Sequence, residues 1–595
     1  MRLREIAQRP DAGPIAILIA MPLVMALFGR EWLYTTIRSL DPWYMIGYFT
    51  YYHDSTFQAD HYKLQRLPWI LPGWILYQVL GPLVANFLLH VGALVVSTVF
   101  VYLTLARLVW RSSAFLVAAL LTVYIPFHGS GGWDYQAAGA GAYYALTLYL
   151  LTRAAQAGEP RRLLVLAGAA FTAAVYTTIH LINFLPVLAA LYFGVGRQAV
   201  SWASAKTALR NGAIGFVAVT VGLCLVNTLV GRGPFFFWPL LKIVFERLAD
   251  PTGQKPWLLA WPAFFKPPGE FIYLLFLIAT LCVVLARLAA AAGGWRLGRV
   301  RLLLLVQYVF LVVLWMAWQH NGHIALWPAI FAHVLVIPAF LALGGLLGGV
   351  PSPTERVPRA LLVAGGALAL VPALQGSDLL QLSRLAIGLT EEVGTAIVAA
   401  TALLTALGFM LAHGLPSRIA LLLTAASFTF AYLHVESRWG MIVRLGNQGE
   451  RYWTRDGCVS HERTYREILR LFRILRSENP VLWQTWLWRG HSGERDFGQD
   501  CRIDLNRLRG STHSTGISNL GLPSDTHPSQ ISDEYVGYVS DGGLVAAMVQ
   551  YDHEADGLVE RFAKAGKTLT FVRREVINLG KVPVVVLIYR SRHAH

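Results

Sequence analysis

The sequence predicts a polytopic α-helical membrane protein that carries an α/β domain at its C-terminus. Of its 595 residues, 55% are hydrophobic and only 14% are charged, and the mean hydropathy is +0.49. Soluble domains contain about 25% charged residues, so we expect most of this chain to lie in lipid. The composition becomes polar after residue 435. We therefore predict a transmembrane domain over residues 1–435 and a separate α/β domain over residues 436–595.

Apolar runs recur along the first domain, about thirteen in all at the lengths typical of membrane helices. They cover residues 15–28, 85–106, 112–127, 135–151, 163–178, 181–195, 213–230, 271–286, 302–318, 324–347, 360–374, 394–412 and 419–435. The first run follows a basic N-terminus, and no small-residue cleavage pattern comes after it. We interpret it as an uncleaved helix rather than a signal peptide. Residues 179–183 lie within one broken helix or between two helices.

The connections between these runs alternate in charge. One set is basic and poor in acids, and the positive-inside rule assigns it to the cytoplasm. That set holds Arg107/Arg111, Arg153/Arg161/Arg162, Arg197/Lys206/Arg210, Arg287/Arg296/Arg299/Arg301, Arg356/Arg359 and Arg418. With an odd number of spans, the N-terminus is cytoplasmic and the C-terminal domain is periplasmic or extracellular. We therefore do not attribute the net charge of +16 to nucleic-acid binding. The polar region also contains no basic helix with interleaved aromatics, which such binding would favour.

The C-terminal domain reads as alternating elements: helices over residues 463–476 and 552–565, and strands over 534–549, 567–577 and 582–589. It contains no nucleophile elbow, Walker loop, zinc-ligand spacing or dinucleotide fingerprint. A structural or acceptor-recruiting cap is the favoured interpretation. Cys458 and Cys501 can form a disulfide if this domain faces an oxidising compartment.

The first outer connection concentrates ionisable residues, which are costly beside a membrane unless they are used. Asp41 can act as a general base toward an attacking hydroxyl, or can cap a helix before Pro42. Arg66, with Lys63 nearby, can hold a lipid phosphate, or can simply reach to the interface. His53 and His61, between these two ends, are candidates for loop structure or substrate contacts.

Three later outer connections add weaker candidates. Asp134 can bind substrate, position a cation or cap a helix. Arg232 stands in a long segment of cations and aromatics that suits a sugar-phosphate site and an interfacial belt equally. His320 and His323 have a spacing found in metal sites, but no acid or Cys accompanies them. Hydrogen bonding to sugar hydroxyls or backbone is therefore favoured over metal ligation.

Together these features resemble the GT-C glycosyltransferases, in particular the bacterial branch related to protein O-mannosyltransferases and the lipid A aminoarabinose transferase. The residues that carry the resemblance are Asp41-Pro42-Trp43, the segment from Arg66 to Gly73, and Trp133-Asp134-Tyr135 with Gly139 and Gly141. The resemblance implies a catalytic base at Asp41 and a donor-phosphate contact at Arg66. It also implies a second acid after Trp133-Asp134-Tyr135, where this chain has Ala137-Ala138.

The resemblance implies a bacterial inner-membrane enzyme. Nucleotide sugars are absent outside the cell and the chain has no nucleotide-binding fingerprint, so we expect a polyprenyl-phosphate sugar as donor. Inverting transfer to a hydroxyl of a glycolipid, lipopolysaccharide or protein would need no cofactor, and a divalent cation is not favoured. One alternative is an oligosaccharyltransferase-like or ligase-like enzyme with a pyrophosphate donor. A transporter or flippase ranks lower, because the charges lie at the surface and no internal repeat occurs.

Overall fold

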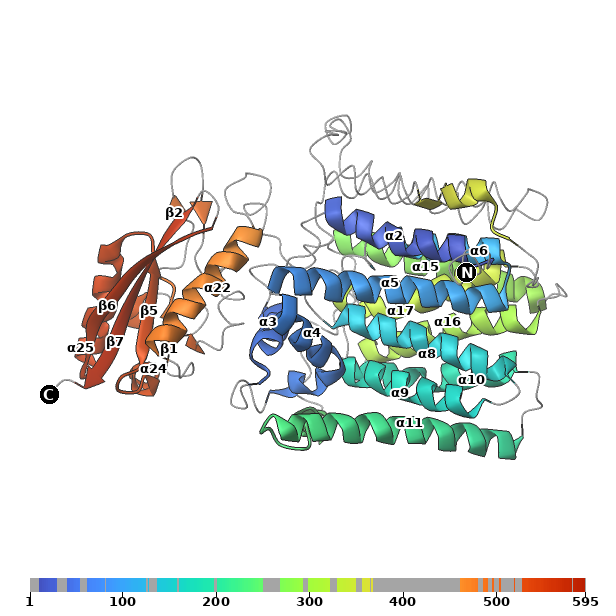
Figure 1. Ribbon diagram of the computed structural model, residues 1–595, viewed down its shortest axis with the longest axis horizontal. Helices are drawn as coiled ribbons and strands as arrows, with labels where there is room; N and C mark the ends of the chain where they lie inside the picture. The colour runs from blue at the N-terminus through green and yellow to red at the C-terminus, as the bar shows by residue number, and fades with distance from the viewer. Residues whose placement is uncertain are drawn as a thin grey trace, which may run out of the picture. The chain divides into compact units, whose positions relative to one another are not determined.

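A computed structural model of the chain contains two compact units, one helical and one built around a β-sheet (Figure 1). The helical unit comprises Met1–Leu33 and Asp60–Leu445, and the sheet unit comprises Tyr34–Ala59 and Gly446–His595. The structure describes residues 10–28, 40–53, 61–80, 82–124, 127, 136–157, 160–196, 201–249, 268–292, 298–320, 329–348, 356–363, 365–366, 461–479, 485–490, 495–496, 502–503, 518–519, 527–579 and 582–593. The predicted domain boundary at residue 435 and the predicted helices over 394–412 and 419–435 lie outside the described residues.

Each apolar run predicted up to residue 347 forms a helix in the helical unit. The elements are α2 (Ala12–Phe28), η2 (Tyr62–Arg66), α4 (Leu67–Leu80), α5 (Pro82–Leu108), α6 (Arg111–Val123), α8 (Ala137–Gln156), α9 (Arg161–Thr177), η3 (Ile179–Phe184), α10 (Leu185–Val195), α11 (Trp202–Leu229), α12 (Trp238–Ala249), α15 (Pro268–Ala292), α16 (Arg299–His320) and α17 (Ala329–Leu347). In the described part of the chain, three helices are long and apolar enough to cross a membrane: Val84–Leu108, Trp202–Leu229 and Arg299–Trp318. The total of about thirteen spans stays a prediction.

The interruption near residue 180 separates two helices. Thr178 ends α9 in an extended conformation, with φ −144° and ψ 101°, and the short 3₁₀ helix η3 then leads into α10.

Helix α9 also packs closely against α11. A Cβ on Gly168 would overlap the Gly212 backbone, and one on Gly215 would overlap the Val165 carbonyl. Small residues therefore let these two backbones touch, as is common between membrane helices.

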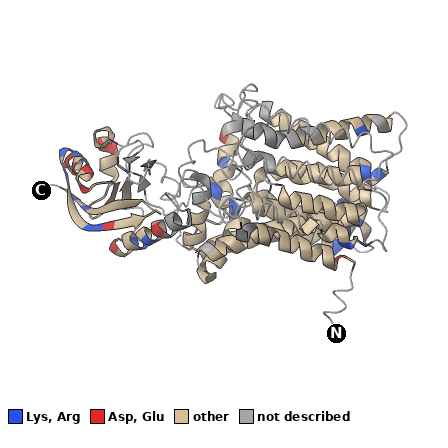
Figure 2. Ribbon diagram, turned by 90° about the horizontal axis from the view of Figure 1, so that it is seen from above, with Lys and Arg blue, Asp and Glu red and all other residues tan. Residues whose placement is uncertain are grey.

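Basic side chains tie the helices together at one end of the helical unit, which we call the basic end. The contacts join connections that the sequence predicts to be cytoplasmic, so these connections do come together at one end (Figure 2). They are Arg111 to Asp11 at 3.0 Å, Arg107 to Gln156 at 3.2 Å, Arg299 to the Phe193 carbonyl at 3.2 Å and Arg301 to the Gly345 carbonyl at 2.8 Å. Figure 1 shows α4 beside the start of α5, away from the end where α5 leads into α6.

The sheet unit contains a five-stranded mixed sheet in the order β4-β1-β5-β7-β6. Strand β1 pairs in parallel with β4 and β5, whereas β7 pairs antiparallel with β5 and β6. The strands are β1 (Thr485–Trp488), β4 (Ser518–Asn519), β5 (Leu544–Val549), β6 (Lys567–Asn578) and β7 (Pro583–His593), and a separate pair joins β2 (Arg495–Asp496) to β3 (Arg502–Ile503). The helices are α3 (Leu40–Tyr51), α22 (His461–Glu478), η8 (Pro528–Gln530), α24 (Asp533–Tyr538), η9 (Asp552–Ala555) and α25 (Asp556–Lys564). All six residues of β5 are buried, so both faces of the sheet are covered.

One expectation about local structure is corrected. The predicted strand over residues 534–549 is a helix followed by a strand, α24 and β5. Ser532 caps α24 by accepting from the Tyr535 amide, acids occupy its first turn, and Gly542, at φ 80°, turns the chain into β5. Residues 40–51 form α3, and a helix beginning near Asp41 and Pro42 was one of the two alternatives for Asp41.

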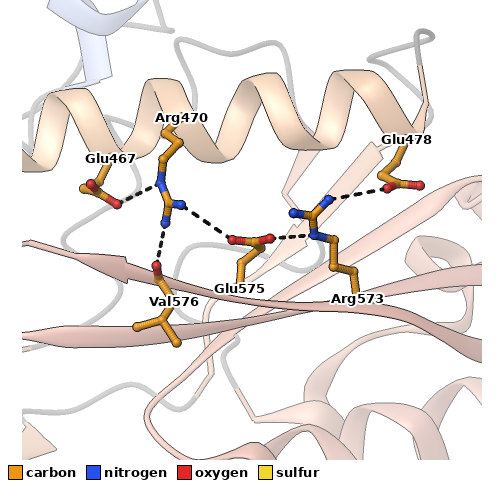
Figure 3. Close-up of polar contacts among 6 residues, drawn as sticks. All are labelled: Glu467, Arg470, Glu478, Arg573, Glu575 and Val576. Carbon is orange, nitrogen blue, oxygen red and sulfur yellow. Dashed lines mark hydrogen bonds and ion pairs between the residues drawn. The ribbon is translucent and has the colours of Figure 1, made fainter.

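Helix α22 is fixed to strand β6 by a line of charged contacts (Figure 3). Arg470 contacts Glu467 at 3.1 Å and Glu575 at 3.7 Å, and it donates to the Val576 carbonyl at 2.6 Å. Arg573 continues the line, 2.5 Å from Glu575 and 4.0 Å from Glu478. Beneath these contacts, the apolar face of α22 is buried at Ile468, Leu471 and Leu475. Helix and sheet therefore form one packed structure.

Candidate functional site

The candidate site is built on a tight turn at the start of α4. His61 precedes η2, and its Nδ1 accepts a hydrogen bond from the Lys63 amide at 3.3 Å. The 3₁₀ turn then continues directly into α4, where Pro68 is tolerated because the first turn needs no amide donor. His61, predicted to support loop structure or to contact substrate, shapes the turn. This turn determines where Lys63 and Arg66 lie.

Both predicted donor-phosphate residues are buried in this turn. Lys63 is 1% exposed and Arg66 is 7% exposed. The Lys63 ammonium lies 5.7 Å, and the Arg66 guanidinium carbon 5.8 Å, from the centre of the Tyr62 ring. Such distances allow cation–π attraction, and two cations side by side are a suitable pair of contacts for an anionic ligand. Tyr62 was not singled out from the sequence, because it is one of many aromatics in its segment.

The second cationic segment predicted to be outside packs against the same turn. Helix α12 lies against η2, and Arg232, on the turn between α11 and α12, is only 5% exposed. Gly231 has φ 80°, and the Arg232 amide donates to the Asn227 carbonyl at 3.0 Å, which reverses the chain after α11. The Asn227 side chain also donates to the Gly233 carbonyl at 2.5 Å. The structure therefore brings together the first outer connection and the segment that carries Arg232.

Helix α8 supports the start of α4 from another side. A Cβ on Gly139 would overlap the Trp69 ring, so glycine is the residue that lets this ring lie on the α8 backbone. Tyr143, one turn later, donates a hydrogen bond to the Pro68 carbonyl at 2.8 Å. The Trp69 ring meets His90 of α5 edge to face, with 5.2 Å between ring centres. These contacts fix the helix that follows Lys63 and Arg66.

Three buried polar side chains that the sequence reasoning missed lie on elements of this region. Gln65 is in η2, Gln136 precedes α8, and Thr178 ends α9, which packs against both η2 and α4. Their exposed fractions are 3%, 5% and 7%. Among the described residues, no partner is found for Gln65 Oε1, Gln136 Oε1 or Thr178 Oγ1. Buried polar atoms are rarely left without hydrogen bonds, so each of the three is a candidate to bind a polar ligand or water.

The remaining predicted residues are placed as follows. Asp41 lies in the first turn of α3, which belongs to the sheet unit; its side chain is outside the described part. His53 follows the same helix and is exposed. His320 is the last residue of α16, again without a described side chain. Asp134, His323, Cys458 and Cys501 lie outside the described residues. Where side chains are described, no group of three or more His, Cys, Asp or Glu could hold a metal ion.

No family model and no curated protein matches the chain. Among solved structures, it is similar to ArnT from Cupriavidus metallidurans bound to undecaprenyl phosphate, with 14% identity and a TM-score of 0.49 over 96% of this chain and 97% of that chain. The apo state of that protein gives 13% identity and a TM-score of 0.48 over 97% and 98% of the two chains. ArnT is the lipid A aminoarabinose transferase named in the sequence resemblance.

Proposed function

We propose that the protein is a membrane glycosyltransferase of the GT-C type, which moves a sugar from a polyprenyl-phosphate donor to an acceptor hydroxyl on the outer face of the membrane. The observation that carries the proposal is the buried pair Lys63 and Arg66 around the Tyr62 ring. Their turn lies in a connection that the charge pattern assigns to the outer face. A lipid phosphate is the anion available to such a site from within a bilayer.

The proposed reaction is a single displacement with inversion. Asp41 accepts the proton of the acceptor hydroxyl as the oxygen attacks the anomeric carbon of the sugar. The bond between that carbon and the phosphate oxygen breaks, and its electron pair leaves with the polyprenyl phosphate. Arg66 and Lys63 stabilise the charge that develops on the leaving phosphate through charge-assisted contacts, with Arg232 as a further cation nearby. Cationic side chains suffice for a monophosphate leaving group, so the reaction requires no metal.

The three buried polar atoms without described partners have a role in the same proposal. Hydroxyl groups of the transferred sugar can donate to Gln65 Oε1 and Gln136 Oε1, and can bond with Thr178 Oγ1. A site built to bond substrate hydroxyls discriminates strongly against analogues that lack them. These residues would therefore select the sugar, while the cations hold the phosphate.

The membrane topology that we propose is the one that the sequence predicts. We infer a multi-pass protein of the bacterial inner membrane with about thirteen spans, a cytoplasmic N-terminus and a periplasmic sheet unit. The gathering of basic connections at one end supports this orientation. The acceptor is a glycolipid, lipopolysaccharide or protein that presents a hydroxyl at the outer face.

Titration of purified protein with polyprenyl phosphate tests the proposal. Arg66→Ala should weaken binding about 10–100-fold, because a hydrogen bond to a charged group contributes about 1.5–3 kcal/mol. Arg107→Ala is the matched control, since it removes the same charge from the basic end. Acceptor binding should be unchanged in both variants. Equal donor affinity in Arg66→Ala and the native protein would refute the assignment.

A further inference from the structure

Helix α3, which carries Asp41, belongs to the same compact unit as the β-sheet. Its second half is almost completely inaccessible to solvent, at Met45, Ile46, Tyr48 and Phe49. A helix so enclosed is fixed in position along most of its length. The proposed base therefore sits on an element whose placement depends on what packs against that half of the helix.

The last residue of α3 contacts α22 directly. The Tyr51 ring meets the Phe472 ring edge to face, with 5.0 Å between ring centres, and the Arg476 guanidinium carbon lies 5.5 Å from the centre of the Tyr51 ring. Tyr51 is 5% exposed and Phe472 is 1% exposed. Burial raises the pKa of the Tyr51 phenol, although Arg476 and Arg473 oppose the shift, so the phenol is neutral at physiological pH. One ring of α3 is thus enclosed by an aromatic and a cation of α22.

Helix α22 cannot shift freely, because the sheet holds it on both sides of these residues. Arg470 binds Glu575 and the Val576 carbonyl before Phe472, and Glu478 contacts Arg573 after Arg476 (Figure 3). Tyr51 is therefore joined through α22 to strand β6. Asp41 is ten residues before Tyr51, which is about 15 Å along an α-helix. A small rotation of α3 about Tyr51 would therefore move Asp41 much further than it moves Tyr51.

We propose that Tyr51, Phe472 and Arg476 are positioning residues that fix α3 to the sheet of the C-terminal unit, so that this unit sets the position of the catalytic base. The proposal rests on the proposed function, because it assigns the base to Asp41. It gives the sheet unit a part in the transfer step beyond that of a structural or acceptor-recruiting cap. Proximity effects make such placement important, since a displacement of about 1 Å can cost about 100-fold in rate.

A double-mutant cycle between Arg476 and Asp41 tests the proposal in the full-length enzyme. Arg476→Ala should lower kcat about 10-fold or more and leave the KM for the donor and the affinity for polyprenyl phosphate unchanged. In the Asp41→Asn background, Arg476→Ala should cause no further loss, because it acts through the group already removed. Arg574→Ala is the control. This side chain pairs with Asp552 at 2.9 Å on the exposed edge of the sheet, so its loss should leave kcat unchanged.

The outcomes separate this proposal from the proposed function. A normal transfer rate in Asp41→Asn would overturn the proposed function. A slow Asp41→Asn enzyme with a normal Arg476→Ala enzyme, or with fully additive losses in the double variant, would overturn the positioning role alone. If Arg476→Ala does not fold, Arg476→Met keeps the apolar stem and replaces it in the cycle, and Arg476→Lys should restore part of the rate. Tyr51→Phe should keep most activity and Tyr51→Leu should lose it, because the ring makes the contact.

Discussion

At the basic end of the helical unit, Arg301 donates to the carbonyls of Gly345 and Leu346, and Arg111 pairs with Asp11. At the other end, Lys63 and Arg66 are buried together around one tyrosine ring. The first group makes hydrogen bonds to carbonyl groups near helix ends and to a carboxylate, and these contacts stabilise the fold. The second group places two cations side by side in a buried turn, where contacts with an anion are strong. The difference teaches that basic residues in this protein occupy two kinds of setting, and the proposed function assigns donor binding to the buried one.

The largest difference should appear between two aspartates, Asp41 and Asp11. Loss of a general base typically costs about 10²–10⁴-fold, so Asp41→Asn should reduce the transfer rate by that factor while donor affinity stays normal. Asp11→Asn removes the carboxylate charge that accepts from Arg111 and Tyr102 at the basic end. It should lower the melting temperature by a few degrees, with a normal rate. Steady-state transfer assays and thermal unfolding of both variants would check this, and equal rates in the two would remove the distinction.

A smaller effect is expected from two helical glycines. Gly139→Ala places a methyl group where the Trp69 ring lies, and overpacking of this kind costs about 1–3 kcal/mol. The shift should reach η2 and weaken donor binding. Gly92→Ala, in α5, meets nothing within 4 Å and should leave stability equal or slightly higher. Unfolding midpoints and donor titrations measure both, and a Gly139→Ala protein with native donor affinity would show that α8 does not support the turn.

The smallest effect compares two glutamines. Gln65→Ala removes a buried amide from η2 and should lower kcat/KM for the donor about 3–10-fold, as expected for loss of one neutral hydrogen bond. Gln156→Ala removes a partner of Arg107 at the basic end and should change kcat/KM little. Comparison of donors with and without individual sugar hydroxyls would extend the test. Equal kcat/KM in the two variants would exclude Gln65 from the sugar site.

Much of the helical unit could be predicted because apolar runs determine membrane helices directly. The alternation of basic connections likewise predicted which of them meet at one end. The turn η2 could not be predicted, because it depends on the His61 cap and on packing by α9 and α12. A helix beginning near Asp41 and Pro42 was one of two alternatives, and its aromatic and β-branched residues, which have low helix propensity, did not indicate that it would extend to Tyr51. Gln136 and Thr178 carry no signal in a single sequence, since only their burial sets them apart.

The central claim is that the donor phosphate binds at η2, with Lys63 and Arg66, and not at the basic end. We call this part of the helical unit the η2 end. A structure determined with polyprenyl phosphate bound in a lipid nanodisc tests it most directly. The account predicts phosphate density within hydrogen-bond distance of Arg66 and Lys63, and loss of that density in Arg66→Ala. Phosphate density at Arg299 and Arg301, or density at the η2 end that persists in Arg66→Ala, would contradict it.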